Sequence, residues 1–504
     1  MRILITDRRS LLGRRLVAAL GHVHEVVTLD TAVEARDRDG AVAATAGCTA
    51  VVHLPLASGA TTPTDLLDIA TRSTYNLLTG GFAGRFVLVS ALHPFERYPR
   101  AWRVNEYWMP RPTTAAADLA PYLAELTARE VARVRPVHVV VLRLGDIVDG
   151  AAIDAHQLHV EDAIHAVERA LAFEPDADHA PTAWSVFHIP AAGRARFPLG
   201  LAGQPPFAYT PRHAVTTESA PAPSADLLPR PLQGRSTPGG TVRRVVVYGA
   251  GGPLAAATTE LLHHDHVLRL TDAHPLAEIV ARGEPQSPGA PLPRLLDRPH
   301  ELAVVDVTDY QQVLAAARGM DAILNCTVVR PHPVDAFRVN MLGAYHVMRA
   351  SVELGIRRVV HTGPFQAGLE HPAGYGADWD LVDEVPARPG DQIYLLTKLL
   401  GQEICRIFAE EHALEVPALL FCSFVAPEQT DPGPMGTFPF SVSWQDAAVA
   451  MRQALHAPAF PAPFEIFHIL TDLPHGKYRN AKAKQLLGWQ PRDRLDQGWQ
   501  RTAD

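Results

Sequence analysis

The first 215 residues alternate between short unbroken apolar runs and longer stretches in which apolar positions recur every three or four residues. An unbroken apolar run is typical of a strand buried on both faces, and the longer period is typical of an amphipathic helix. We expect strands at 3–6, 25–30, 50–54, 85–90 and 137–144, and helices at 11–20 and from 159 onward. This alternation predicts a doubly wound α/β domain with a parallel sheet.

The same order of elements begins again after residues 216–241, which are rich in Pro, Ser, Thr and Gly and show no periodicity. Such a segment is typical of a linker. We therefore expect a first Rossmann-like domain at 1–215, the linker at 216–241, and a second Rossmann-like domain with a short C-terminal substrate part at 242–504. The repeated order indicates a tandem duplication.

Composition excludes several classes of protein. Of the 504 residues 47% are hydrophobic and 20% are charged, and the formal net charge is −8, so no basic surface for nucleic acid is expected. No apolar run approaches the ~20 residues of a membrane helix. The cysteines show no paired spacing and the N-terminus shows no signal pattern, which favours a cytoplasmic protein. The 24 histidines are scattered, so we expect no metal site.

A glycine-rich turn opens the second domain. The strand around Val245–Val247 stops at Gly249, and Gly252 and Ala255 follow at three-residue steps into a helical pattern. Glycines allow a sharp turn and let backbone N–H groups approach a pyrophosphate, and a small third residue lets the helix pack on the sheet. The next strand ends at Asp272, where a carboxylate can accept hydrogen bonds from the adenosine ribose. A carboxylate there repels a 2′-phosphate, which favours NAD over NADP.

A tyrosine and a lysine form the second motif. Tyr394 and Lys398 are four residues apart in a helical stretch and therefore share a face. An ammonium group beside a phenol lowers the phenol pKa from ~10, so the tyrosinate can take a proton from a substrate hydroxyl. The alternative is an exposed Tyr–Lys pair without chemistry. Lysine is rare in this chain and occurs at Lys398, Lys477, Lys482 and Lys484, which favours a chemical requirement at the first of these.

The first domain lacks these groups at the matching positions. Asp7 and Ser10 stand where the second domain has its first and third glycines, Leu126 stands in place of the lysine, and Ala70 stands in place of Asn340. Side chains in the turn, one of them acidic, would fill the space that a pyrophosphate needs. The first domain is therefore predicted to be a degenerate copy without a nucleotide site.

With these motifs, the second half resembles the extended short-chain dehydrogenase/reductase superfamily, of the NAD-dependent epimerase/dehydratase type. Besides the glycines, the resemblance rests on Asp306-Val307, Asn340-Met-Leu-Gly343, Tyr394-x-x-x-Lys398 and Leu487-Gly-Trp-Gln-Pro. The first half resembles the same family through Val51-Val-His53-Leu and His159-Val-Glu-Asp162.

The resemblance implies an NAD site. Its expected members are Gly249, Gly251, Gly252, Pro253, Leu254, Asp272, Asp306, Val307, Asn325, Cys326, Thr327, Asn340, Tyr394 and Lys398. It also implies a catalytic Ser or Thr that hydrogen-bonds the substrate oxygen. By strand register that place falls on Pro364, which has no donor, and Thr362 lies ~6.6 Å earlier along an extended strand. Thr362 is the candidate third catalytic residue, with structural packing as its alternative role.

Within the family, Leu268-Arg-Leu-Thr-Asp272, Pro427-Glu428 and the short C-terminal tail are similar to uronate dehydrogenases, which oxidise hexuronic acids with NAD. Two departures from those enzymes stand out. They have Ser-Ser-Asn where this chain has Gly363-Pro364-Phe365. They also carry an arginine for the sugar carboxylate after the Pro-Glu pair, whereas residues 429–443 contain none.

The resemblance implies an NAD-dependent oxidoreductase that acts on a hydroxyl of a sugar or sugar acid. Two alternatives stay open: an epimerase that retains its NAD, and a non-catalytic NAD-binding regulatory or scaffold protein. Family members dimerise through two helices that flank the catalytic strand. We therefore expect the helix at 71–78 and the Tyr122 helix to dock on the helix at 340–352 and the Tyr394 helix, as an intrachain pseudo-dimer. The other expected partner is a small-molecule substrate, with neither nucleic acid nor a membrane.

Overall fold

The computed structural model describes residues 1–56, 59–99, 101–175, 183–193, 196–216, 242–287, 289–364, 383, 386–426, 441–472 and 479–495. The chain divides into two compact units, Met1–Leu228 and Pro229–Asp504. Each unit contains a parallel sheet flanked by helices, which confirms the predicted Rossmann-like fold class. The predicted linker, apart from Thr216, lies outside the described residues.

A six-stranded parallel sheet forms the centre of the first unit, in the order β2-β1-β3-β4-β5-β8. Its strands are β1 (Arg2–Ile5), β2 (Glu25–Thr28), β3 (Ala50–His53), β4 (Arg85–Ala91), β5 (His138–Leu144) and β8 (Trp184–Ile189). A separate parallel pair joins β6 (Asp146–Val148) to β7 (Gln157–His159). The central strands are buried without alternation, as expected for a sheet that is covered on both faces.

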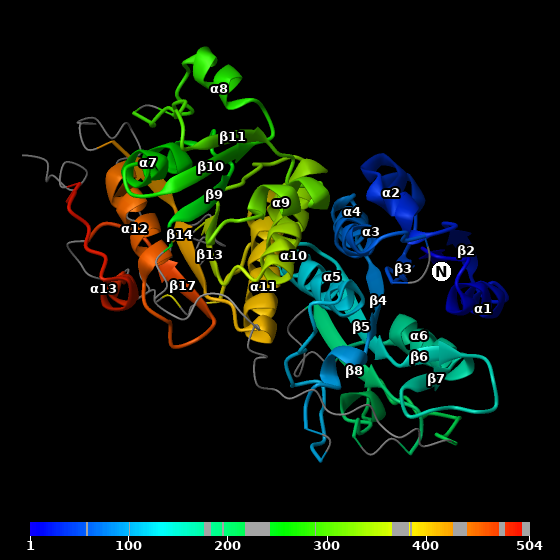
Figure 1. Ribbon diagram of the computed structural model, residues 1–504. Helices are drawn as coiled ribbons and strands as arrows, with labels where there is room; N and C mark the ends of the chain where they lie inside the picture. The colour runs from blue at the N-terminus through cyan, green and yellow to red at the C-terminus, as the bar shows by residue number, and fades with distance from the viewer. Residues whose placement is uncertain are drawn as a thin grey trace, which may run out of the picture. The chain divides into compact units, whose positions relative to one another are not determined.

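Helices cover both faces of this sheet (Figure 1). They are α1 (Leu11–Leu20), α2 (Arg38–Thr45), α3 (Pro63–Asp68), α4 (Thr74–Thr79), α5 (Ala116–Ala132) and α6 (Val160–Ala172). Shorter helical turns are η1 (Ala32–Arg36), η3 (His93–Phe95) and η4 (Leu201–Gly203), and η2 (Ile69–Ser73) is π-helical. Helix α1 packs on α6, whereas α3, η2 and α4 pack on α5.

The second unit has a seven-stranded parallel sheet in the order β11-β10-β9-β12-β13-β14-β17. Its strands are β9 (Arg244–Tyr248), β10 (Val267–Asp272), β11 (Glu301–Val304), β12 (Ala322–Asn325), β13 (Arg358–Pro364), β14 (Val416–Phe421) and β17 (Phe464–His468). A short pair, β15 (Ser423–Val425) and β16 (Ser441–Ser443), stands apart from it. Apart from the added edge strand β11, the strand order repeats that of the first unit.

Two groups of helices flank the second sheet (Figure 1). The helices are α7 (Pro253–Leu262), α8 (Leu276–Arg282), α9 (Tyr310–Ala317), α10 (Gly343–Leu354), α11 (Ile393–His412), α12 (Trp444–His456) and α13 (Ala481–Leu487), with π-helical η5 (Ala336–Leu342) before α10. Helix α7 packs on α12, and α9, α10 and α11 pack in sequence. Among the described helices, none is both long and apolar enough to cross a bilayer.

The two units also share a local feature that the sequence pattern did not predict. A π-helical stretch precedes α4 in one unit and α10 in the other, and the matched positions Ala70 and Asn340 lie within these stretches. A π-helical turn has the same composition as an α-helix, so apolar periodicity does not reveal it.

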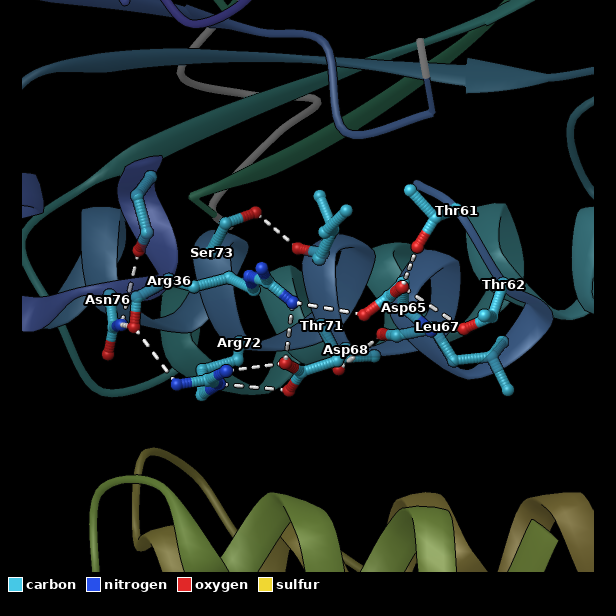
Figure 2. Close-up of polar contacts among 12 residues, drawn as sticks. Arg36, Thr61, Thr62, Asp65, Leu67, Asp68, Thr71, Arg72, Ser73 and Asn76 are labelled. Atoms are coloured by element: carbon cyan, nitrogen blue, oxygen red, sulfur yellow. Dashed lines mark hydrogen bonds and ion pairs between the residues drawn. The ribbon is translucent and has the colours of Figure 1, made fainter. Parts of the chain in front are cut away.

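A polar network stabilises the first of these stretches (Figure 2). The buried Asp68 carboxylate accepts hydrogen bonds from Arg72 Nε at 2.9 Å and from Arg36 Nη1 at 3.3 Å. Arg72 Nη1 and Asn76 Nδ2 donate to the carbonyl of Arg36. The network ties η1 to the helix formed by α3, η2 and α4 within the first unit.

Candidate functional site

A cavity of about 860 Å³ opens at the carboxyl ends of the strands in the second unit. It lies where the strand order reverses between β9 and β12, which is the usual ligand position in a doubly wound sheet. Predicted site residues that line it are Gly249, Gly251, Gly252, Pro253, Leu254, Asp272, Cys326, Thr362, Tyr394 and Lys398. The structure therefore brings the glycine turn and the Tyr–Lys helix to one cavity.

The turn after β9 leaves no room for larger side chains. Gly249 has φ +79°, and a Cβ atom there would lie 2.9 Å from the carbonyl oxygen of Cys326. A Cβ atom on Gly251 would lie 2.5 Å from Ile279 Cδ1. Gly252 is the N-cap of α7 and Pro253 begins that helix, so no side chain caps its first turn. This open helix start can accept an anionic group.

Asp272 ends β10 beside this turn. Its Oδ2 accepts a hydrogen bond from the Gly251 amide at 2.9 Å, which holds the carboxylate against the glycine turn. The cavity is also lined by His274, Arg282, Gln286 and Ser287, from the segment that follows β10. These four residues were not predicted, because the segment that follows the strand carries no motif.

Lys398 lies at the centre of the site. Its side chain is buried, and Nζ donates hydrogen bonds to the carbonyl oxygens of Thr362 at 2.8 Å and Thr327 at 3.0 Å. Burial lowers the pKa of Lys398 to about 8, because desolvation disfavours the ammonium form. An ammonium group has three donors, so one N–H remains available.

Tyr394 lies one helical turn before Lys398 on α11 and lines the same cavity. Burial raises its pKa above the ordinary value, and the positive charge of Arg330 opposes that rise. The Arg330 guanidinium carbon lies 5.7 Å from the centre of the Tyr394 ring. The expectation that Lys398 lowers the Tyr394 pKa is thus corrected for the protein alone: the pKa is raised, and the opposing cation is Arg330.

Thr362 contributes mainly through its backbone. Its hydroxyl donates to the carbonyl of Asn325 at 2.9 Å, which links β13 to β12, and its own carbonyl accepts from Lys398. Pro364, the last residue of β13, lines the cavity and has no donor. These contacts agree with a structural packing role for Thr362, which was the alternative to a catalytic role. Phe365 and the Pro427-Glu428 pair lie outside the described residues.

Five predicted cofactor residues do not line the cavity, namely Asp306, Val307, Asn325, Thr327 and Asn340. Asp306 Oδ1 accepts from the Thr308 amide at 2.8 Å, as a turn residue does. Asn325 is buried and accepts from the Thr327 hydroxyl at 2.8 Å. The contacts that these side chains make support the loops around the cavity.

Asn340 has a defined supporting role. Its Oδ1 accepts from the Val329 amide at 2.9 Å, and its Nδ2 donates to the Val329 carbonyl at 2.8 Å. Nδ2 also donates to Thr397 Oγ1 on α11 at 3.0 Å. One buried amide therefore holds the loop after β12 against the helix that carries Tyr394 and Lys398.

The matching turn of the first unit is filled by its own side chains. The fully buried Asp7 carboxylate accepts from the amides of Arg9 at 3.0 Å and Ser10 at 3.1 Å. The Ser10 hydroxyl accepts from the Gly13 amide and caps α1. Asp30, which matches Asp272 in sequence, pairs with Arg8 and Arg9, and these pairs lower its pKa. The Arg9, Ser10 and Gly13 amides of this turn are therefore already bonded within the protein.

The described residues bring one set of possible metal ligands together, in the first unit. His159, Glu161 and His213 have ligand atoms within 4.8 Å of one another. The two imidazole rings stack with centroids 3.8 Å apart, and His159 Nδ1 accepts from the Glu161 amide at the start of α6. Capping and stacking account for this group without an ion.

Comparison with known proteins defines the class of the second unit. Residues 245–443 match the NAD dependent epimerase/dehydratase family. The second unit is therefore similar to that family over residues 245–443, and NAD is the cofactor that the description of the family names. The matched segment includes the glycine turn, Asp272, Tyr394 and Lys398.

Particular relatives are distant. The L-arabinose 1-dehydrogenase (NAD(P)(+)) of Haloferax volcanii is 27% identical over 185 residues, which are 34% of this chain and 64% of that protein. Solved structures include glucuronic acid dehydrogenase from Chromohalobacter salexigens, at 22% identity and TM-score 0.41, covering 52% of this chain and 91% of that one. Uronate dehydrogenase from Agrobacterium tumefaciens has 22% identity, TM-score 0.40 and the same coverage.

Proposed function

We propose that the second unit is an NAD-dependent oxidoreductase that acts on a hydroxyl of a sugar or sugar acid. The observation that carries this proposal is the convergence of the glycine turn, Tyr394 and Lys398 on one cavity. A dehydrogenase needs its cofactor site and its proton acceptor at the same place. The names of the distant relatives, which refer to arabinose and uronate, agree with this substrate class.

The residues present fit a dinucleotide. The Gly249 turn, which a Cβ atom would block, and the uncapped start of α7 would receive the pyrophosphate. Asp272 would bind the adenosine ribose, and the remaining N–H of Lys398 would bind the second ribose. Bound NAD would supply the hydride acceptor for oxidation of the substrate.

Tyr394 would hold the substrate hydroxyl and take its proton. Its raised pKa keeps the phenol neutral in the protein alone, so proton transfer would depend on the positive charge of Arg330 and on the positive charge that bound NAD brings. The hydroxyl of Thr362 is bonded to Asn325, so the second hydrogen bond to the substrate oxygen must come from another donor.

The test combines binding with turnover. We expect calorimetry to show NAD binding to the full chain, and a panel of sugars, uronates and lactones to yield NADH with one of them. Lys398→Met should reduce kcat by at least ~100-fold, since proton transfer and cofactor positioning fail together. Lys484→Met, in a lysine outside the cavity, is the matched control and should keep full activity. Full turnover by the Lys398→Met variant would contradict this mechanism.

Two other functions remain as candidates. An epimerase would bind NAD and convert the sugar without net NADH, so product analysis separates it from a dehydrogenase. A regulatory or scaffold protein would bind NAD without turnover of any compound. Pro364 in the place of a catalytic hydroxyl and the raised Tyr394 pKa favour this second alternative.

We also propose that the chain arose by duplication and that residues 1–215 form a degenerate domain, joined by 216–241 to the domain at 242–504. The repeated strand order and the π-helical stretches support a common origin. The first domain would act as an intrachain pseudo-dimer partner through its helices at α4 and α5. Cysteines that are all unpaired agree with a cytoplasmic location.

A further inference from the structure

An arginine at the cavity has no role in the cofactor site proposed above. Arg330 follows β12, lines the cavity beside Tyr394, and is exposed. Within the described part of the chain its guanidinium makes no hydrogen bond or ion pair, and its defined contact is with the Tyr394 ring. An arginine fork without a carboxylate partner keeps all its donors available for a ligand.

The backbone beside this arginine is fixed. The backbone amide of Val329 donates to Asn340 Oδ1 at 2.9 Å, and its carbonyl accepts from Asn340 Nδ2 at 2.8 Å. Asn340 also bonds Thr397 on α11, three residues after Tyr394. The loop that carries Arg330 and the helix that carries Tyr394 are therefore joined by one buried amide, so the base of the arginine side chain is held relative to the tyrosine.

The distribution of charge in the cavity points to an anionic substrate. Asp272 is the only carboxylate among the described lining residues, and it is bonded to the Gly251 amide at the glycine turn. The cations of the lining are Arg282, Arg330 and Lys398. Lys398 is bonded to two carbonyls, whereas Arg330 is beside the proposed proton acceptor. A substrate bound at Tyr394 therefore meets a positive side chain, and no acid lies beside it among the described lining residues.

We propose that Arg330 binds the carboxylate of the substrate and so makes the site selective for sugar acids over neutral sugars. This inference rests on the proposed oxidoreductase function and names the substrate class of that site. A planar guanidinium can bind a carboxylate through two parallel hydrogen bonds, which a hydroxymethyl group cannot reproduce. Arg330 would also supply a hydrogen-bond donor next to Tyr394, where Pro364 has none and the Thr362 hydroxyl is already bonded.

Matched substrates test the proposal. Galacturonate and galactose, or glucuronate and glucose, differ only in a carboxylate against a hydroxymethyl group at C6. We expect kcat/KM for the acid to exceed that for the neutral sugar by at least ~10-fold, since charge-assisted hydrogen bonds are among the strongest. Arg330→Gln should lower this ratio toward ~1, mainly through KM for the acid. A ratio near ~1 in the unaltered protein, or a ratio that Arg330→Gln leaves unchanged, would overturn the proposal.

Two further variants separate recognition from charge. Arg330→Lys keeps the positive charge but loses the fork, so it should lower the ratio while leaving the pH dependence of kcat near that of the unaltered protein. Arg330→Gln should also move the pH dependence to higher pH, because the charge that opposes the raised Tyr394 pKa is gone. Arg318→Gln, at the end of α9 outside the cavity, is the control and should change neither property.

Ligand binding distinguishes this proposal from the proposed function. If NAD binds but no compound is oxidised, the oxidoreductase proposal fails, and titration of the NAD-loaded protein with galacturonate then tests Arg330 alone. Trp444 lines the cavity, so intrinsic fluorescence is a suitable readout. We expect Arg330→Gln to weaken binding by at least ~10-fold and Arg318→Gln to leave it unchanged. Equal affinity in all three proteins, or no binding to any of them, would overturn the assignment.

Discussion

At the scale of single residues, the buried ammonium group of Lys398 is a costly feature of the site. Its ammonium group is buried and is bonded to the carbonyls that follow β12 and lie within β13. Two hydrogen bonds to neutral carbonyls do not fully replace water around a charge, and for this reason the pKa falls to about 8. The protein thus holds a destabilising charge at the place where the proposed reaction needs one.

This charge predicts a pH dependence of stability. The pKa of Lys398 is lower in the folded state than its ordinary value of 10.5, so between about pH 8 and 10.5 the unfolded chain binds more protons. The contribution of this group to the free energy of unfolding therefore rises with pH across that window. Below about pH 8 the buried ammonium group lowers the stability by its full amount, about 3 kcal/mol.

Lys398→Met removes the titration. We expect urea unfolding of the second unit to show that the unaltered protein gains stability relative to this variant between neutral pH and about pH 10. Lys484→Met, at a partly exposed lysine of α13, should track the unaltered protein across the same range. A constant difference between the unaltered protein and Lys398→Met would show that the lysine is not buried as a charge.

Lys398 and Arg330 differ in how far the sequence could reveal their place in the site. Lys398 was predictable, because lysine is rare in this chain and stands four residues after a tyrosine. Arg330 was not, because arginine is the chain's usual basic residue and its position beside Tyr394 depends on the Asn340 side chain. Asn340 and Thr327 were predicted to touch the cofactor. In the structure the Asn340 side chain bonds the Val329 backbone and Thr397, and the Thr327 hydroxyl bonds Asn325.

At the level of elements, the turns after β1 and β9 both lead into a helix, and they differ in the groups that occupy the turn. Each turn starts a helix and must satisfy backbone amides at its N-terminus. In the first unit the Ser10 hydroxyl caps α1, and the Asp7 carboxylate accepts hydrogen bonds from the Arg9 and Ser10 amides just before that helix. In the second unit glycines keep the equivalent space open, and the first turn of α7 has no side-chain cap. The turn after the first strand therefore holds a carboxylate of its own in the first unit and none in the second unit.

Substitution in each turn should have opposite consequences. Asp7→Ala leaves two amides without their acceptor and should lower the stability of the first unit by about 1–3 kcal/mol, with NAD affinity unchanged. Gly249→Ala forces a Cβ atom to 2.9 Å from the Cys326 carbonyl at φ +79° and should abolish NAD binding. Urea unfolding and calorimetry measure the two properties. Loss of NAD binding in Asp7→Ala would indicate a nucleotide site in the first unit.

Regular elements followed from the sequence because their apolar periods are local. The helix predicted at 11–20 matches α1, and the strands predicted near β3, β4 and β5 agree within one or two residues. Features that depend on tertiary contacts did not follow. The π-helical stretches η2 and η5 read as ordinary helix, and the polar network around Asp68 joins segments more than thirty residues apart.

For the whole molecule, the question is what the first unit contributes. The first unit keeps a full parallel sheet and a buried core, although its turn is occupied by Asp7. A domain without a ligand site can still serve as a permanent partner. In the proposed pseudo-dimer, the helix pair of the first unit replaces the second subunit of a homodimer, so the intact chain should be monomeric.

Cleavage between the units tests this arrangement in the folded protein. A protease site inserted within residues 217–241 allows the chain to fold intact and then be cut, with the uncut protein as control. A stable interface commonly buries about 1,600 Å², so we expect the two pieces to stay together in gel filtration at micromolar concentration. We also expect the piece that contains 242–504, prepared alone, to self-associate, because the proposed partner surface of its helices is then uncovered. Pieces that separate after cleavage and remain monomeric would contradict the pseudo-dimer, while leaving the proposed chemistry of the second unit intact.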